Sequence, residues 1–151
     1  MKTRRNQNGT TAVEFAIVGV VFFTVLFALI DFSRLFWDMA ALDESTRRGA
    51  RVAAVCPIND PQIAQVALFA GLVPSLGTEH ILVQYLDEDG AVVGSPGGAG
   101  YGKIRYVRVG IQNFQLQTFI PGLTSVLPTP GFVTTIPSES LGRVGTANVS
   151  C

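Results

Sequence analysis

The fold is decided by residues 15–30, FAIVGVVFFTVLFALI, an uncharged stretch near the N-terminus. Twelve of its residues are Phe, Ile, Val or Leu. A helix from Phe15 to Ile30 would span about 24 Å, less than the roughly 30 Å hydrocarbon core of a bilayer. We therefore expect a transmembrane helix and exit segment over residues 10–37, with Trp37 near the far membrane interface.

Charge is scarce and unevenly distributed along the 151 residues. Charged residues make up 15% of the chain, against about 25% in an average soluble domain. The formal net charge is zero, which argues against nucleic acid as a partner. Residues 1–9 hold Lys2, Arg4 and Arg5 and no acid, so the remainder carries eight bases against eleven acids. The positive charge is therefore concentrated at the N-terminus.

A basic N-terminus before an apolar run allows three interpretations. A buried core helix is disfavoured because a basic N-terminus followed at once by an unbroken apolar run is typical of a targeting segment. A cleaved secretory signal peptide needs a small-x-small site after the run, and only Leu26-Phe27-Ala28 comes close before Asp31. A signal anchor is favoured, with the bases in the cytoplasm and the C-terminal domain outside it.

The helical pattern continues beyond the membrane segment. No proline occurs from Asp31 to Val55, and Pro57 then ends a helix of some 70 Å that begins near Thr10. We assign residues 38–56 to the helix continuation outside the membrane. The predicted apolar stripe consists of Phe32, Leu35, Phe36, Met39, Leu42, Thr46, Ala50 and Ala53.

Charged pairs accompany this stripe. Asp43–Arg47 and Glu44–Arg48 have the favourable acid-before-base order at i,i+4. Asp31 and Arg34, three residues apart, are expected to pair at the outer membrane surface rather than to serve recognition.

A short motif marks the junction of leader and helix. Gly9 follows the basic stretch, and cleavage between Gly9 and Thr10 would make Glu14 the fifth residue of the mature chain. This arrangement resembles the class III leader of type IV pilins and pseudopilins, which implies that residues 1–9 are a basic leader peptide. In a bundle of such helices the Glu14 carboxylate could neutralise the amino group of Thr10 on a neighbour, so that two costly buried charges become one pair and set the axial register. The alternative is that Glu14 has no pairing role and is an interfacial carboxylate at a helix N-terminus, where the macrodipole favours an acid.

The resemblance extends further. TTAVEFAIV, followed by IDFSRLFWDMAALDESTRRGAR, resembles the TadE-like minor pilin family of the Flp/Tad system over about Gly9 to Ala54. It implies a pilin-like protein cut by a prepilin peptidase at Gly9 and Thr10. Many type IV pilins have Phe at the first mature position, where this chain has Thr10.

Residues 57–151 are predicted to form an extracytoplasmic α+β domain, a small antiparallel sheet packed on the outer half of the long helix. Asp60-Pro61 predicts a helix start, with Gly71 at its end. Its inward face would hold Ile63, Val66, Ala67 and Ala70. The predicted sheet elements and connections are strand Ile81–Leu86, a turn at Asp87–Gly90, a hairpin partner at Val92-Val93, a flexible stretch Gly94–Gly102, strand Tyr101–Phe114, a loop marked by Pro121, Pro128 and Pro130, and a strand around Phe132–Ile136.

The two cysteines are candidates for a disulfide. If the domain faces an oxidising compartment, a Cys56–Cys151 bond would tie the C-terminus to the end of the long helix. Two free thiols are the alternative, because sequence gives no Cα separation.

No catalytic or metal-binding constellation emerges. His80 is the only histidine and is placed in a loop before a strand, without partners at metal-ligand spacing. Ser138-Glu139-Ser140 lacks a nucleophile-elbow context, and Asp87–Gly90 lacks the spacing of a calcium loop. We expect no catalytic residue, no metal, no cofactor and no small-molecule substrate.

Three functions remain in contention. The leading hypothesis is a non-catalytic minor pilin in the bacterial inner membrane or in an adhesive pilus, with other pilins and Tad assembly subunits as partners through its N-terminal helix. The second is an unprocessed, signal-anchored periplasmic binding module that recruits an assembly partner. The third is an anchored hydrolase, which would require a role for His80 or a serine.

Overall fold

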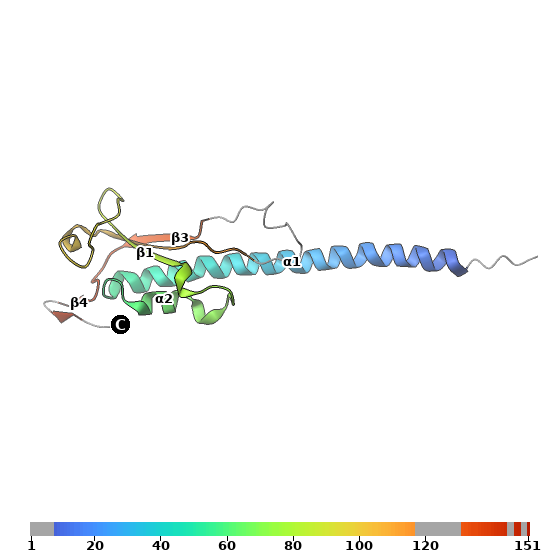
Figure 1. The fold of residues 1–151 in the computed structure, drawn as a ribbon, viewed down its shortest axis with the longest axis horizontal. Helices are drawn as coiled ribbons and strands as arrows, with labels where there is room; N and C mark the ends of the chain where they lie inside the picture. Colours follow the sequence, from blue (N-terminus) through green and yellow to red (C-terminus); the bar gives the residue numbers. More distant parts are fainter. Residues whose placement is uncertain (1–7, 117–130, 145–146, 149–150) are drawn as a thin grey trace, which may run out of the picture.

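A computed structural model describes residues 8–116, 131–144, 147–148 and 151. One long helix runs through the molecule, and a small α+β domain packs on its C-terminal half (Figure 1). The elements are α1 (Asn8–Val55), α2 (Pro61–Ala67), η1 (Phe69–Gly71), η2 (Thr78–His80), β1 (Ile81–Leu86), η3 (Tyr101–Lys103), β2 (Tyr106–Ile111), β3 (Val133–Pro137), β4 (Arg143–Val144) and β5 (Ala147–Asn148). The predicted pilin-like α+β fold is confirmed.

The sheet that covers α1 has the order β1-β2-β3 and is antiparallel throughout. Its register pairs Ile81 with Ile111 and Leu86 with Tyr106 across β1 and β2. Alternation places Val107 and Val109 of the central strand β2 on the inner face, where both are fully buried against α1. The short strands β4 and β5 form a separate pair.

Helix α1 buries more than the predicted stripe because α2 and the sheet pack on it from different directions. Leu35, Leu42, Thr46, Ala50 and Ala53 are buried as predicted, whereas Phe32 and Phe36 are exposed. The structure instead adds small residues to the buried surface, namely Ala41, Ser45, Gly49 and Ala54.

Small side chains on α1 allow the close approach of its neighbours. A Cβ at Gly49 would lie 3.0 Å from both Ala67 Cβ and Val109 Cγ1, so the helix, α2 and β2 meet there. Ser45 Oγ donates a hydrogen bond to the carbonyl of Ala67, and Thr46 Oγ1 shares one of 2.8 Å with Thr134 Oγ1. These bonds satisfy polar groups that the packing removes from water.

Helix α2 begins where the sequence predicts and ends earlier. The Asp60 carboxylate accepts a 2.9 Å hydrogen bond from the Gln62 N–H, as expected of an N-cap residue. The helix ends at Ala67, and positive φ angles in η1 turn the chain away. The predicted inward face is therefore half wrong, because Ile63 and Ala67 are buried while Val66 and Ala70 are exposed.

Three predictions for the sheet connections need correction. The hairpin partner at Val92-Val93 is shorter than a strand: Leu86 and Val92 form a single bridge on the free edge of β1, and the Val93 N–H donates to the Tyr85 carbonyl. The stretch Gly94–Gly102 forms successive hydrogen-bonded turns instead of a flexible connection. These turns lead into η3, so the strand predicted from Tyr101 begins only at Tyr106. The loop predicted around Pro121, Pro128 and Pro130 lies outside the described residues.

The C-terminal end of α1 is capped by a distant segment. The last carbonyls of a helix lack intrahelical partners. Here the Ala54 carbonyl accepts from the N–H groups of Glu139 and Leu141, and the Val55 carbonyl accepts from the Gly142 N–H and from Ser140 Oγ. Gly142 has a φ of +74°, and a Cβ there would lie 2.6 Å from Pro57.

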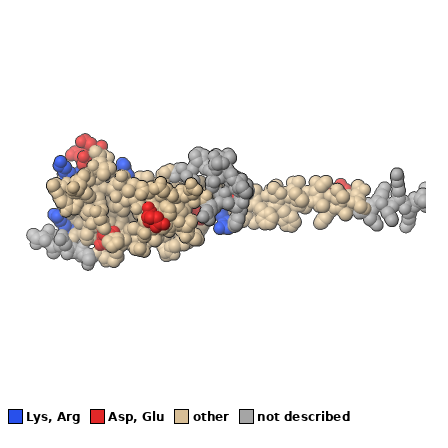
Figure 2. All heavy atoms as spheres, viewed as in Figure 1, with Lys and Arg blue, Asp and Glu red and all other residues tan. Residues whose placement is uncertain are grey.

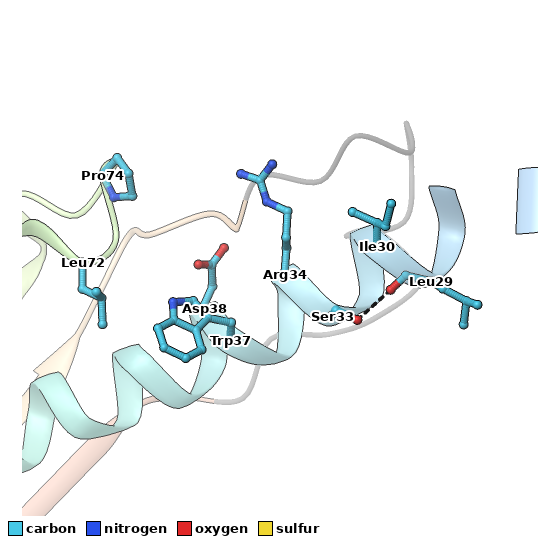
Figure 3. Close-up of a pocket in the computed structure, with 8 residues that line it drawn as sticks. All are labelled: Leu29, Ile30, Ser33, Arg34, Trp37, Asp38, Leu72 and Pro74. Carbon is cyan, nitrogen blue, oxygen red and sulfur yellow. Dashed lines mark hydrogen bonds between the residues drawn. The ribbon is translucent and has the colours of Figure 1, made fainter. Parts of the chain in front are cut away.

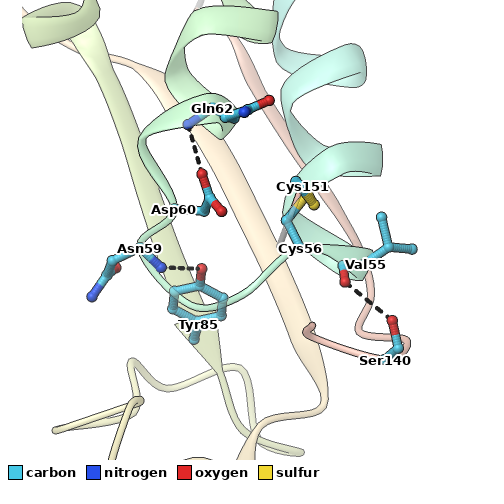
Figure 4. Close-up of a disulfide and its surroundings, with 8 residues drawn as sticks. All are labelled: Val55, Cys56, Asn59, Asp60, Gln62, Tyr85, Ser140 and Cys151. Atoms are coloured by element: carbon cyan, nitrogen blue, oxygen red, sulfur yellow. Dashed lines mark hydrogen bonds between the residues drawn. A yellow bond between two sulfur atoms is a disulfide. The ribbon is translucent and has the colours of Figure 1, made fainter. Parts of the chain in front are cut away.

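A disulfide joins the same helix end to the C-terminal residue (Figure 4). Cys56 and Cys151 have a Cα separation of 5.7 Å, within the usual range for a disulfide. Nearby, the Asn59 N–H donates a 3.1 Å hydrogen bond to the buried Tyr85 hydroxyl. Burial raises the pKa of Tyr85, and the bond from Asn59 lowers it in part.

Overpacking at Gly49 should destabilise the domain. Gly49→Leu is expected to lower the free energy of unfolding by about 1–3 kcal/mol, because the new side chain meets α2 and β2. Arg51→Leu, at an exposed position of the same helix, should change it by no more than about 0.5 kcal/mol. Urea denaturation of the full chain in detergent measures both, and equal effects would contradict the packing.

Removal of the disulfide should cost more. The double variant Cys56→Ser/Cys151→Ser is expected to lose about 4 kcal/mol, since the bond closes a long loop in the unfolded chain. The same denaturation experiment measures the loss, and adding reductant to the wild-type protein should reproduce it. A wild-type stability that is insensitive to reductant would argue for free thiols.

Candidate functional site on the N-terminal helix

The leader junction lies on the first turns of α1, away from the domain. Gly9 and Thr10 are exposed, and a Cβ at Gly9 would meet no atom within 4 Å. The backbone around the predicted cut is therefore not covered by other described parts of this chain. The basic residues Lys2, Arg4 and Arg5 lie outside the described residues.

Glu14 projects from the same helix and is also exposed. It follows Thr10 by four residues, which places the two on one face of α1 with an axial rise of about 6 Å. Glu14 is the one charged residue of the sequence between Gly9 and Ile30. A carboxylate at this point can be neutralised by a cation at the level of Thr10.

The segment from Phe15 to Ile30 has the character of a single membrane-spanning helix. In the described part of the chain, α1 alone is long and apolar enough to cross a membrane, and none of its most apolar window is buried. Figure 2 shows this half of the molecule as a slender rod with little charge, while charged residues gather on the domain. Phe15 is 78% exposed, and the rings of Phe22, Phe23 and Phe27 follow one another along the surface.

The exposed apolar side chains of residues 15–30 indicate which environment this half of α1 suits. Soluble monomers rarely expose a continuous apolar surface of this length. In the uncovered helix every backbone group except those at the ends is satisfied internally, as a lipid environment demands. Residues 15–30 thus have the surface of a helix suited to lipid or to a bundle of other apolar helices.

The exit of α1 from this segment forms an open hollow against the domain (Figure 3). Ile30, Arg34 and Trp37 line it from the helix, and Leu72 and Pro74 line it from the segment after η1. A second, smaller hollow shares Trp37 and Leu72. The contribution of the domain to this hollow was not predicted, although the apolar run Leu72-Val73-Pro74 after Gly71 could have indicated it.

Acidic groups near the exit differ in their surroundings. Asp31 is only 3% exposed, which the expected surface pairing with Arg34 did not foresee. Asp38 lies one turn beyond Arg34 and lines the hollow. Burial raises the pKa of the Asp38 carboxyl, and the Arg34 guanidinium lowers it in part.

The outer half of α1 carries the predicted charged pairs. Asp43 and Arg47 form an ion pair of 2.6 Å, and Glu44 and Arg48 one of 2.9 Å. The hydrogen bond from Arg48 lowers the pKa of Glu44, and the Arg48 guanidinium also stacks over the Phe69 ring at 3.7 Å. Exposed ion pairs of this kind contribute little to stability, so we assign them no role beyond the solvated face of α1.

His80 has a structural environment in η2, directly before β1. Its Nδ1 accepts a 3.0 Å hydrogen bond from the Gly77 N–H, and its ring packs nearly perpendicular to the Phe114 ring. Ser140, from the other segment considered for chemistry, bonds the end of α1. Within the described ranges, no group of three or more His, Cys, Asp and Glu side chains is arranged to hold a metal ion.

Comparison with known proteins bears on the first part of the chain. Residues 9–51 match the family model described as TadE-like protein. The match covers most of α1, including Gly9, Thr10, Glu14 and the exit segment. No curated protein and no solved structure matches the chain. The family match thus confirms the resemblance inferred from the sequence motifs over the N-terminal helical segment, residues 9–51.

Proposed function

We propose that this protein is a TadE-like minor pilin, a non-catalytic structural or assembly component of a Tad/Flp (type IVb) pilus. The observation that carries the proposal is the division of α1 into an uncovered apolar half and a half that forms the core of the domain. The uncovered half contains the motif of Gly9, Thr10 and Glu14 and lies within the family match. A helix of this kind can move from lipid into a helical bundle, because both environments cover the same apolar surface.

The proposal includes a maturation step and an orientation. A prepilin peptidase removes residues 1–9, leaving Thr10 as the first residue. Residues 1–9 face the cytoplasm, α1 crosses the bacterial inner membrane once, and the domain lies in the periplasm or outside the cell. The Cys56–Cys151 disulfide agrees with an oxidising compartment for the domain.

The partners are other pilins and TadE-like or Tad assembly subunits, which bind through the N-terminal helix. In the bundle, Glu14 of one subunit neutralises the Thr10 amino group of a neighbour. This pairing removes two isolated charges from an apolar environment and sets the axial stagger between subunits. Adhesion would then be a property of the assembled pilus.

Processing should depend on Gly9. In cells with an active prepilin peptidase, Gly9→Val is expected to keep residues 1–9, since the added branched side chain obstructs cleavage next to it. Gly19→Val, at the other glycine of the apolar half, should be processed normally. Intact-mass measurement of both membrane-purified variants distinguishes the outcomes. If wild type and Gly9→Val both retain residues 1–9, so that their masses differ only by the substitution, the unprocessed binding module is favoured.

Assembly should depend on the charge of Glu14. Glu14→Gln is expected to weaken association with partner pilins by about two orders of magnitude or more, because an unpaired buried amine costs about 3–5 kcal/mol. The domain should be unaffected, since the N-terminal part of α1 extends away from the sheet and α2 (Figure 1). Membrane insertion should be retained, since the apolar run Phe15–Ile30 is unchanged.

Thr24→Val serves as the control for this substitution. It also replaces a polar residue on the same exposed helix, but the Thr24 hydroxyl bonds only the Val20 carbonyl of its own helix. Co-purification from detergent extracts measures the association of each variant. If Glu14→Gln associates as fully as wild type, Glu14 does not pair with a neighbour and is only a carboxylate at the membrane interface.

A further inference from the structure

The hollow at the exit of α1 connects two parts of the molecule with different surroundings (Figure 3). At one end it is lined by Leu29 and Ile30, which belong to the apolar segment. At the other end it is lined by Leu72 and Pro74, which belong to the domain. Whatever medium surrounds the apolar segment therefore continues up to the domain.

The axial position of this hollow follows from helix geometry. From Phe15 to Trp37 an α-helix rises about 33 Å, close to the roughly 30 Å thickness of the hydrocarbon core. Trp37 is then at the outer edge of the bilayer, where tryptophan is enriched. Because Leu72 lines both hollows together with Trp37, the domain reaches the same level.

The side chains at this level suit an interface better than water. Phe36 is 67% exposed, Trp37 is 61% exposed and Leu72 is 40% exposed. They come from two segments, α1 and the chain after η1, and they adjoin the apolar half of α1. Arg34 and Asp38 add charged groups in the same hollow, as is usual where a protein surface passes from acyl chains to headgroups.

We propose that residues Leu72–Pro74 dock on the outer lipid surface beside the exit of α1. Lipid fills the hollow from the side of Leu29 and Ile30, and Leu72 and Pro74 enter the boundary between headgroups and acyl chains. The membrane then holds the protein at two points, the spanning helix and this segment, which fixes the tilt of the domain. The proposal rests on the membrane-spanning part of the proposed function and is independent of leader cleavage.

The single tryptophan of the chain makes a direct test possible. The full-length protein is reconstituted into phosphatidylcholine vesicles whose acyl chains carry bromine at defined depths, and quenching of indole fluorescence reports depth. The variants are wild type, Trp37→Phe/Leu72→Trp, Trp37→Phe/Pro74→Trp and Trp37→Phe/Val92→Trp. The last variant is the matched control. It places the indole at Val92, an exposed residue just after the Asp87–Gly90 turn.

We expect the indoles at positions 37, 72 and 74 to be quenched several-fold more than the indole at position 92. Quenching should be strongest for bromine about 5–10 Å below the headgroups, the depth of interfacial side chains. Unchanged far-ultraviolet circular dichroism and a retained disulfide confirm that each variant is folded.

Two other results would overturn the inference and can be told apart. Quenching at position 37 with none at positions 72 and 74 would support the membrane span but contradict the docking of Leu72–Pro74 on lipid. If the indole at 72 is also blue-shifted without being quenched, a second copy of the chain covers the hollow instead of lipid. An absence of quenching at every position would contradict the membrane-spanning assignment of α1, which is part of the proposed function.

Discussion

The close packing of α1 against α2 and β2 around Gly49 and Ala50 joins the two halves of this molecule. The sheet has one apolar face, and without the helix Val107 and Val109 would face water. The helix therefore supplies the core of the domain, while the same continuous rod presents an apolar surface beyond it. Because one helix performs both tasks, the domain cannot change its orientation without moving or bending the rod.

This constraint explains the reinforcement at the far end of the helix. The segment Glu139–Gly142 satisfies the last carbonyls of α1, and the Cys56–Cys151 bond ties down the end of the chain. Both features hold distant parts of the sequence to a single point on α1. In a pilin the force carried by the N-terminal helix would pass directly into the domain core, so a secured helix end is consistent with the proposed structural role.

Much of this architecture could be predicted from the sequence, for a physical reason. A long uncharged run, helical periodicity and an Asp-Pro helix start are local signals, and they gave the extent of α1, the start of α2 and the positions of β1 and β2. The position of Gly9, Thr10 and Glu14 on the first turns of one helix could also be predicted, because all three lie in one short motif. Their roles in cleavage and in pairing stay predictions.

The remaining features depend on contacts between distant residues. Periodicity placed Phe36 on the buried stripe, but the domain packs on a wider arc of small residues and leaves that ring exposed. The capping of α1 by Ser140 and Leu141 and the approach of Leu72 to Trp37 have no local signature either. They arise only when the sheet and α2 close around the helix.

The central claim is that α1 becomes the N-terminus of a mature pilin, and N-terminal sequencing of the wild-type chain tests it most directly. The protein is isolated from membranes and from sheared surface fibres of cells with an active prepilin peptidase, and from membranes of cells that lack it. We expect Thr10 as the first residue in cells with the peptidase and residues 1–9 still attached in cells without it. An intact leader in both would contradict the central claim.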